Sequence, residues 1–268
     1  MNTSSDHNPY QPPTADVTPP IDEDEGWVSG GRAVPVGNAA TWIGQGWALF
    51  VKSPGVWILN VIIVFVLCAI AASIPLLGGL TSNLLMPVIF AGILLGCRSL
   101  DNDGGLRVEH VFAGFKENVG QLILVGLLLF AATIAILVIV ALAILVLFGG
   151  AIFHAMGNPQ AMSAFATGHV LQILALAVLL AFAFFIPVSM AYWFAPALIV
   201  FHQLDAVTAM KQSFQGCLRN ILPFLIYGLL MFLLFIAALI PFGLGLLILG
   251  PVVYGSIYAS YRDIYLRQ

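Results

Sequence analysis

The chain has 268 residues, of which 61% are apolar and only 8% are charged, and its formal net charge is −3. Because soluble proteins carry about 25% charged residues, this composition excludes a water-soluble globular fold and indicates an integral membrane protein. No catalytic, metal or nucleotide motif appears, so the function has to be inferred from the architecture.

The first region, residues 1–37, differs from the rest of the chain in composition. It is rich in proline, serine and threonine, and its acidic residues, including the run at 22–25, outnumber the single Arg32. Such a segment cannot bury enough apolar surface to offset the entropy of folding. We therefore predict a disordered cytoplasmic tail over 1–37 and a polytopic membrane domain over 38–268. The acidic run is either a solvated spacer or a contact for a partner protein.

Six uncharged apolar stretches follow, and each is close to the roughly 20 residues that a membrane-spanning helix needs. The third and fourth stretches are longer than a bilayer core is thick, so we expect them to tilt or to project from the membrane. Pro187 and Pro196 are expected to bend the fourth. The sequence thus predicts an all-α integral membrane protein with spans at about 55–75, 80–97, 119–149, 170–201, 221–241 and 244–261.

Positive charge is confined to one set of loops. Every lysine and arginine lies near a terminus or within 98–116 and 202–219, whereas the intervening loops at 76–83, 150–169 and 242–243 carry no charge. The positive-inside rule then places both termini in the cytoplasm.

A recurring pattern divides the six spans into three units. An aromatic residue followed by polar residues precedes the first, third and fifth spans, at Trp47, Phe112 and Phe214. Since each unit begins on the charged side, we predict three tandem parallel helical hairpins, each preceded by a short cytoplasmic interfacial helix. The clearest such helix begins at Asp205, the expected N-cap. Its expected apolar face consists of Val207, Met210, Phe214 and Cys217.

The first and last units share a proline in the returning helix. Pro87 and Pro251 precede Arg98 and Arg262, respectively, by the same 11 residues. Proline-interrupted helices in matching positions point to a midplane binding site, and proline is also common in membrane helices as a simple kink. The candidate cleft lining consists of Pro87, Pro187, Ser189, Tyr192, Trp193, Pro196 and Pro251.

Six cations near the span ends form a predicted basic ring at the cytoplasmic face. Their role in setting the topology is sufficient to explain them, and a specific site for anionic phospholipid is a further hypothesis. The candidate lipid contacts are Lys52, Arg98, Lys116, Lys211, Arg219 and Arg262.

Several short runs carry a resemblance to known proteins. They are Gly46-Trp47-Ala48-Leu49-Phe50, Ile74-Pro75 with Leu77-Gly78, Met86-Pro87-Val88, Phe112-Ala113-Gly114-Phe115, Phe194-Ala195-Pro196-Ala197-Leu198 and Tyr258-Ala259-Ser260-Tyr261-Arg262-Asp263-Ile264-Tyr265. Over about 46–265 the chain resembles an uncharacterised family of proteobacterial inner-membrane proteins. More distantly, it is similar to the membrane domain of some glycerophosphodiester phosphodiesterases, without their catalytic domain. The resemblance implies six spans and a bacterial plasma membrane, and it supplies no activity.

Reactive groups are sparse in the predicted membrane domain. No Asp, Glu, Lys or Arg falls within a predicted span, which disfavours an ion-coupled pump. His154 and His169 flank an outer turn, but two histidines without a third ligand predict no metal site. Cys97 and Cys217 lie near arginines, although nothing pairs either with a base. We expect no cofactor and no enzymatic activity.

Two functions remain open from the sequence. The first is a non-enzymatic binder or carrier of lipid or another hydrophobic compound, with a cleft between the hairpins. The second is a membrane scaffold or accessory subunit that recruits another membrane protein. The expected partners are the lipid bilayer, anionic phospholipid or a membrane protein, and no nucleic acid. The oligomeric state is left open.

Overall fold

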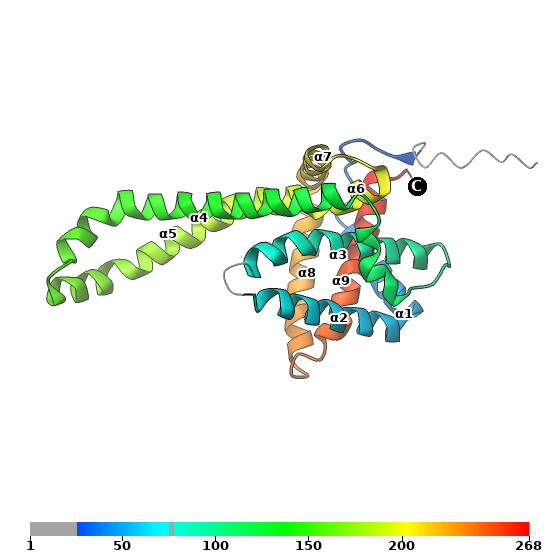
Figure 1. Ribbon diagram of the computed structural model, residues 1–268, viewed down its shortest axis with the longest axis horizontal. Helices are drawn as coiled ribbons and strands as arrows, with labels where there is room; N and C mark the ends of the chain where they lie inside the picture. Colours follow the sequence, from blue (N-terminus) through cyan, green and yellow to red (C-terminus); the bar gives the residue numbers. More distant parts are fainter. Residues whose placement is uncertain (1–25, 75–77, 268) are drawn as a thin grey trace, which may run out of the picture.

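The computed structural model describes residues 26–74 and 78–267, and within these ranges the protein is all-α (Figure 1). The one strand-like pairing there is an isolated antiparallel bridge between Trp27 and Leu266. The predicted all-α class is therefore confirmed. In chain order the helices are α1 (Asn38–Lys52), α2 (Pro54–Ala72), α3 (Gly78–Asp101), the 3₁₀ helix η2 (Val108–Phe115), α4 (Val119–Ala155), α5 (Pro159–Trp193), α6 (Ala195–His202), α7 (Ala206–Arg219), α8 (Ile221–Leu239) and α9 (Leu246–Tyr265).

Local sequence sets several helix starts. The carboxylate of Asp205 accepts hydrogen bonds from the backbone N–H groups of Val207 and Thr208, so the predicted N-cap of α7 is confirmed. Asn158 caps α5 in the same way, and proline follows it at the first helical position.

Five helical segments in the described ranges are long and apolar enough to cross a membrane. α9 is not among them, since Ser256, Ser260 and Asp263 make its C-terminal half more polar. The structure thus supports a multi-pass membrane protein, and the sixth span stays a prediction. The five segments are Pro54–Ala72, Gly78–Asp101, Val119–Ala155, Thr167–His202 and Ile221–Leu239.

Among the long helices, α4 packs extensively on both α5 and α3, whereas the α2–α3 and α8–α9 contacts are smaller. Figure 1 shows α4 and α5 projecting far beyond the other helices, and no residue of their most apolar stretches is buried in the protein. The α8–α9 pair runs across the direction of α4 and α5. The turns that close these two pairs lie far from α7 and the C-terminus.

Three surface helices, α1, η2 and α7, pack on three returning helices, α9, α3 and α5, in a cyclic order. η2 packs on α3, α7 packs on α5, and α1 packs on α9. α3 and α5 are therefore each covered by the surface helix that follows them in sequence. α9, the last helix, is covered by α1, the first. Glycine makes two of these contacts close: a Cβ on Gly114 would overlap the carbonyl oxygen of Val88, and one on Gly46 would lie 2.5 Å from that of Val252.

The segment 26–37 packs on the C-terminal end of α9 through Asp263, which is only 7% exposed. The Asp263 carboxylate accepts hydrogen bonds from Asn38 Nδ2 at 2.7 Å and from Trp42 Nε1 at 2.9 Å, and it is paired with Arg32 Nη2 at 3.1 Å. We refer to Asp263, Arg32, Asn38 and Trp42 as the Asp263 cluster. It ties the start of the described chain to its end.

The structure describes only the last part of the predicted tail, residues 26–37. Residues 1–25 lie outside the described residues, whereas 26–37 contact the helical body. The Trp27 ring stacks on the ring of His202 with centroids 4.9 Å apart, and the Asn220 side chain accepts a hydrogen bond from the Val34 N–H at 2.9 Å. Composition reports local tendencies, whereas 26–37 is held by partners about 175 positions or more away, so the boundary of the tail stays a prediction.

We expect Gly114→Ala to destabilise the protein by about 1–3 kcal/mol, because the added methyl group overlaps the backbone of α3 and one of the two helices must move. Gly120→Ala is the matched control, since a Cβ there meets no atom within 4 Å. Thermal unfolding in detergent micelles, followed by circular dichroism, compares the two. An unchanged melting temperature for Gly114→Ala would contradict the close packing of η2 on α3.

We expect Asp263→Ala to lower the free energy of unfolding by about 3 kcal/mol, because the Arg32 charge and the buried Trp42 N–H lose their acceptor. Asp103→Ala removes a carboxylate that is paired with Lys52 on the surface and should cost no more than about 1 kcal/mol. Denaturant titration in micelles measures both. Equal losses for the two variants would show that the Asp263 cluster does not hold the fold together.

Candidate functional site

Three of the six cations in the predicted basic ring are engaged by the protein itself. Lys52 Nζ lies 3.3 Å from a carboxylate oxygen of Asp103, and Arg262 is paired with Asp101. Arg219 donates a hydrogen bond to the backbone of segment 26–37. These cations therefore join the ends of α1, α3, α7 and α9 to their neighbours.

The other three cations are arranged differently. The guanidinium carbon of Arg98 lies 5.4 Å from the centroid of the Phe201 ring, within cation–π range. Lys116 and Lys211 are exposed, and neither forms an ion pair with any residue that the structure describes. Their charges are available to groups outside the protein.

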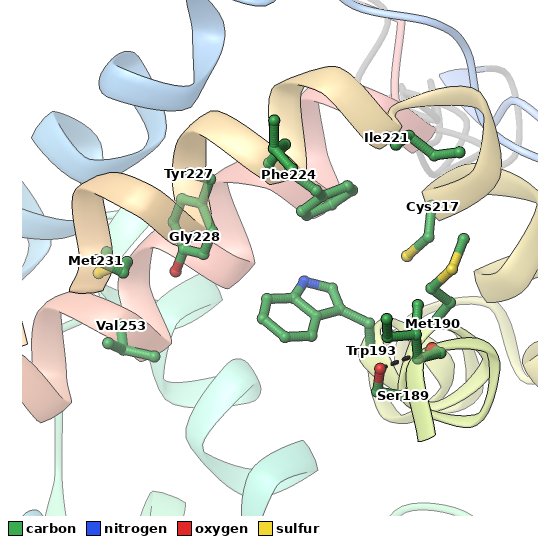
Figure 2. Close-up of a pocket in the computed structure, with 12 residues that line it drawn as sticks. Ser189, Met190, Trp193, Cys217, Ile221, Phe224, Tyr227, Gly228, Met231 and Val253 are labelled. Carbon is green, nitrogen blue, oxygen red and sulfur yellow. Dashed lines mark hydrogen bonds between the residues drawn. The ribbon is translucent and has the colours of Figure 1, made fainter. Parts of the chain in front are cut away.

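An apolar groove of about 500 Å³ lies between α5 and α8, with single contributions from α7 and α9 (Figure 2). Its volume falls within the range of small-molecule sites, about 300–1,000 Å³. The lining side chains come from α5 and from the three consecutive helices α7, α8 and α9. Those labelled in Figure 2 are Ser189, Met190, Trp193, Cys217, Ile221, Phe224, Tyr227, Gly228, Met231 and Val253.

Two of the seven predicted cleft residues, Ser189 and Trp193, line this groove. Their neighbour Tyr192 packs instead near the ring of Phe90, with centroids 6.2 Å apart. Pro187 is exposed on α5 and does not line the groove. One part of the predicted stretch around Pro187 therefore faces the groove and the rest faces elsewhere.

The other three predicted cleft residues, Pro87, Pro196 and Pro251, are buried in α3, α6 and α9. Pro87 leaves the carbonyl of Asn83 without its helical donor, and a Cβ on Gly126 of α4 would overlap that carbonyl. Pro87 and Pro251 also immediately precede the valines on which the surface helices pack. The structure thus places these prolines at helix contacts and does not bring the seven residues into one cavity.

Sequence reasoning missed the α8 side of the groove. Ile221, Phe224, Leu225 and Gly228 line it and are spaced as i, i+3, i+4 and i+7, which places them on one face of a helix. That spacing could have identified the face. It was obscured because nearly every position of α8 is apolar, so no contrasting polar face marks it.

The polar atoms of the groove are few. The Tyr227 hydroxyl and Ser256 Oγ are hydrogen-bonded at 2.6 Å, and the Ser189 hydroxyl donates to a backbone oxygen of its own helix at 2.7 Å. The Trp193 indole N–H is buried without a hydrogen-bond partner in the described residues, and Figure 2 shows its nitrogen on the side of the ring toward Phe224. The groove therefore offers mainly apolar surface, and the one donor in its lining without a partner in the described ranges is buried.

Chemically reactive groups near the groove are suppressed by their surroundings. Burial raises the pKa of Cys217 to about 12, opposed in part by a hydrogen bond with Ser213, so the thiol stays protonated and weakly nucleophilic at neutral pH.

Away from the groove, His169, one of the two outer histidines, hydrogen-bonds with Gln172 at 3.1 Å. Among the described residues, no three His, Cys, Asp or Glu side chains are grouped so that they could hold a metal ion.

Comparison with known proteins agrees with a membrane location. The chain is 27% identical over 246 residues to a protein of Burkholderia thailandensis named as a probable inner membrane protein, and the alignment covers 82% of this chain and 88% of that protein. No family model matches the chain. No solved structure matches it. The similarity and the five apolar helices together support a multi-pass inner-membrane protein, in line with the resemblance to an uncharacterised family of such proteins.

Proposed function

We propose that this chain is a non-enzymatic binder or carrier of lipid or another hydrophobic compound, and that the groove between α5 and α8 is its binding site. The observation that supports the proposal is the groove itself, about 500 Å³ of space lined by apolar side chains from four helices. Space of this kind in a membrane protein is filled by an apolar molecule, because water gains few hydrogen bonds there.

The mouth of the groove is open to the surrounding bilayer. Ile186, Ile221 and Leu225 line it and are 52%, 51% and 65% exposed, respectively. In a membrane these side chains contact lipid chains, so an acyl chain can enter sideways without crossing water. A phospholipid acyl chain is the simplest ligand that this geometry accepts.

The unused Trp193 donor gives the ligand a chemical signature. An ester carbonyl oxygen is a hydrogen-bond acceptor that lies beside an acyl chain, and a modest turn of the indole ring would present the N–H to it. The remaining polar groups, Ser189 and Tyr227, are already hydrogen-bonded, and no base lies beside Cys217 in the groove lining. These features favour binding over catalysis.

We further propose six spans with both termini in the cytoplasm, α9 being the sixth. The α4–α5 and α8–α9 turns lie far from the C-terminus and α7, as this topology requires (Figure 1). At 1.5 Å per residue, the 37 residues of α4 extend about 55 Å, which exceeds a hydrocarbon core of about 30 Å. A strong tilt of α4 and α5 fits their length and also brings the crosswise α8–α9 pair into the same bilayer.

A scaffold or accessory subunit is the second candidate function. It is favoured by the α4–α5 pair, which projects beyond the other helices and has unburied apolar surface along its most apolar stretches (Figure 1). Such a surface can pack against a second membrane protein.

The distant resemblance to membrane domains of glycerophosphodiester phosphodiesterases stays part of the lipid proposal, since those domains accompany enzymes of lipid chemistry.

We expect Gly228→Leu to block the groove, because a side chain at that position enters open space within it. Native mass spectrometry of gently extracted protein should show phospholipid on the wild type and about tenfold less on the variant. Gly150→Leu is the matched control, an exposed glycine of α4 where a Cβ also meets no atom within 4 Å. Equal lipid retention by all three proteins would contradict the proposal, and a stoichiometric protein partner without lipid would favour the scaffold.

A further inference from the structure

The bulky apolar side chains of α7 are not those that the protein buries. α7 is fixed to the α5–α6 junction by Ser213, whose hydroxyl accepts from the Phe194 N–H at 2.9 Å and donates to the Met190 carbonyl oxygen at 2.7 Å. The predicted apolar face of α7 is therefore divided, since Cys217 is buried in the protein and Val207 is 47% exposed. The residues that α7 buries are Ala206, Ala209, Ser213, Gly216 and Cys217.

The apolar side chains of α7 that remain partly or fully exposed border a second groove, of about 510 Å³, between α4, α5 and α7. Leu128 of α4 and Ala191 of α5 form one wall, and Met210 and Phe214 of α7 form the other. Lys211 and Gln215 lie one residue further along α7 and also line the groove. An apolar channel thus ends beside one cation and one amide.

We propose that this second groove binds one anionic phospholipid of the cytoplasmic leaflet. The lipid phosphate contacts Lys211 and the Gln215 amide, and one acyl chain lies over Met210, Phe214 and Leu128. The site is separate from the groove of Figure 2, whose lining holds no cation, so it extends the proposed function and does not depend on it.

Charge selects the ligand. Lys211 is exposed and forms no ion pair within the described ranges, whereas Arg32, Lys52 and Arg262 are each paired with an aspartate. An amphipathic helix with a free apolar stripe and a lysine beside it lies at the membrane surface, where anionic headgroups are concentrated. A zwitterionic phospholipid offers the same acyl chains but a positive group that Lys211 repels.

The test uses the full chain in micelles with equal amounts of phosphatidylglycerol and phosphatidylcholine, and native mass spectrometry counts the lipid that each variant retains. We expect the wild type to retain more phosphatidylglycerol than phosphatidylcholine. In K211Q the ratio of retained phosphatidylglycerol to phosphatidylcholine should fall about fivefold, because one surface cation contributes about 1 kcal/mol to the binding of an anionic headgroup. K211R should retain it. R267Q is the control, an exposed cation that lies outside the groove and is not among the candidate lipid contacts, and it should leave the preference unchanged.

Three outcomes would overturn the proposal. Equal losses in K211Q and R267Q would show general surface charge and no site, and an unchanged preference in K211Q would exclude Lys211. Displacement of the lipid by excess inorganic phosphate would show a site for a free anion. Because Gly228→Leu does not touch this groove, it should keep the phosphatidylglycerol preference even where it empties the groove of Figure 2, so the two proposals fail separately.

Discussion

The exclusion of charge from hydrocarbon is the constraint on which this structure depends, because it leaves one end of the helical body to carry nearly all electrostatic contacts. The pairs Arg32–Asp263, Lys52–Asp103 and Arg262–Asp101 lie there, and they connect elements that are distant in sequence. Away from that end, the long helices pack mainly through apolar side chains and glycines, with few polar contacts such as the Tyr227–Ser256 hydrogen bond. The charged end is consequently the fixed part of the molecule, and the helix pairs extend from it.

The cyclic packing of surface helices on returning helices gives the fixed end its order. Glycines at 46 and 114 permit backbone contact directly after the prolines of α9 and α3, so the repeated sequence pattern has a packing function. The third contact, of α7 on α5, uses small residues and the Ser213 hydroxyl instead. It leaves bulky apolar side chains of α7 uncovered, and both grooves adjoin this helix. Of the three contacts, the one between α7 and α5 thus covers its surface helix least, and this is where ligands are proposed to bind.

The sequence alone was sufficient for five apolar helices and one helix cap, and insufficient for the grooves. Hydropathy located five of the six predicted spans, and Asp205 was identified from its residue type and position, because these depend on local composition. The groove between α5 and α8 depends on which helices become neighbours, which the spacing of Pro87 and Pro251 does not report. Likewise, the order of 26–37 comes from Asp263 and Asn220, far along the chain, and no local pattern announces it.

Sidedness is the central claim of this account, and reporter fusions at the two termini test it most directly. Alkaline phosphatase is active only outside the cytoplasm, and green fluorescent protein exported in the unfolded state fluoresces only inside it. We predict fluorescence without phosphatase activity for fusions at both the amino and the carboxyl terminus. Phosphatase activity at either terminus would contradict a single charged cytoplasmic face and the lipid sites that we place beside it.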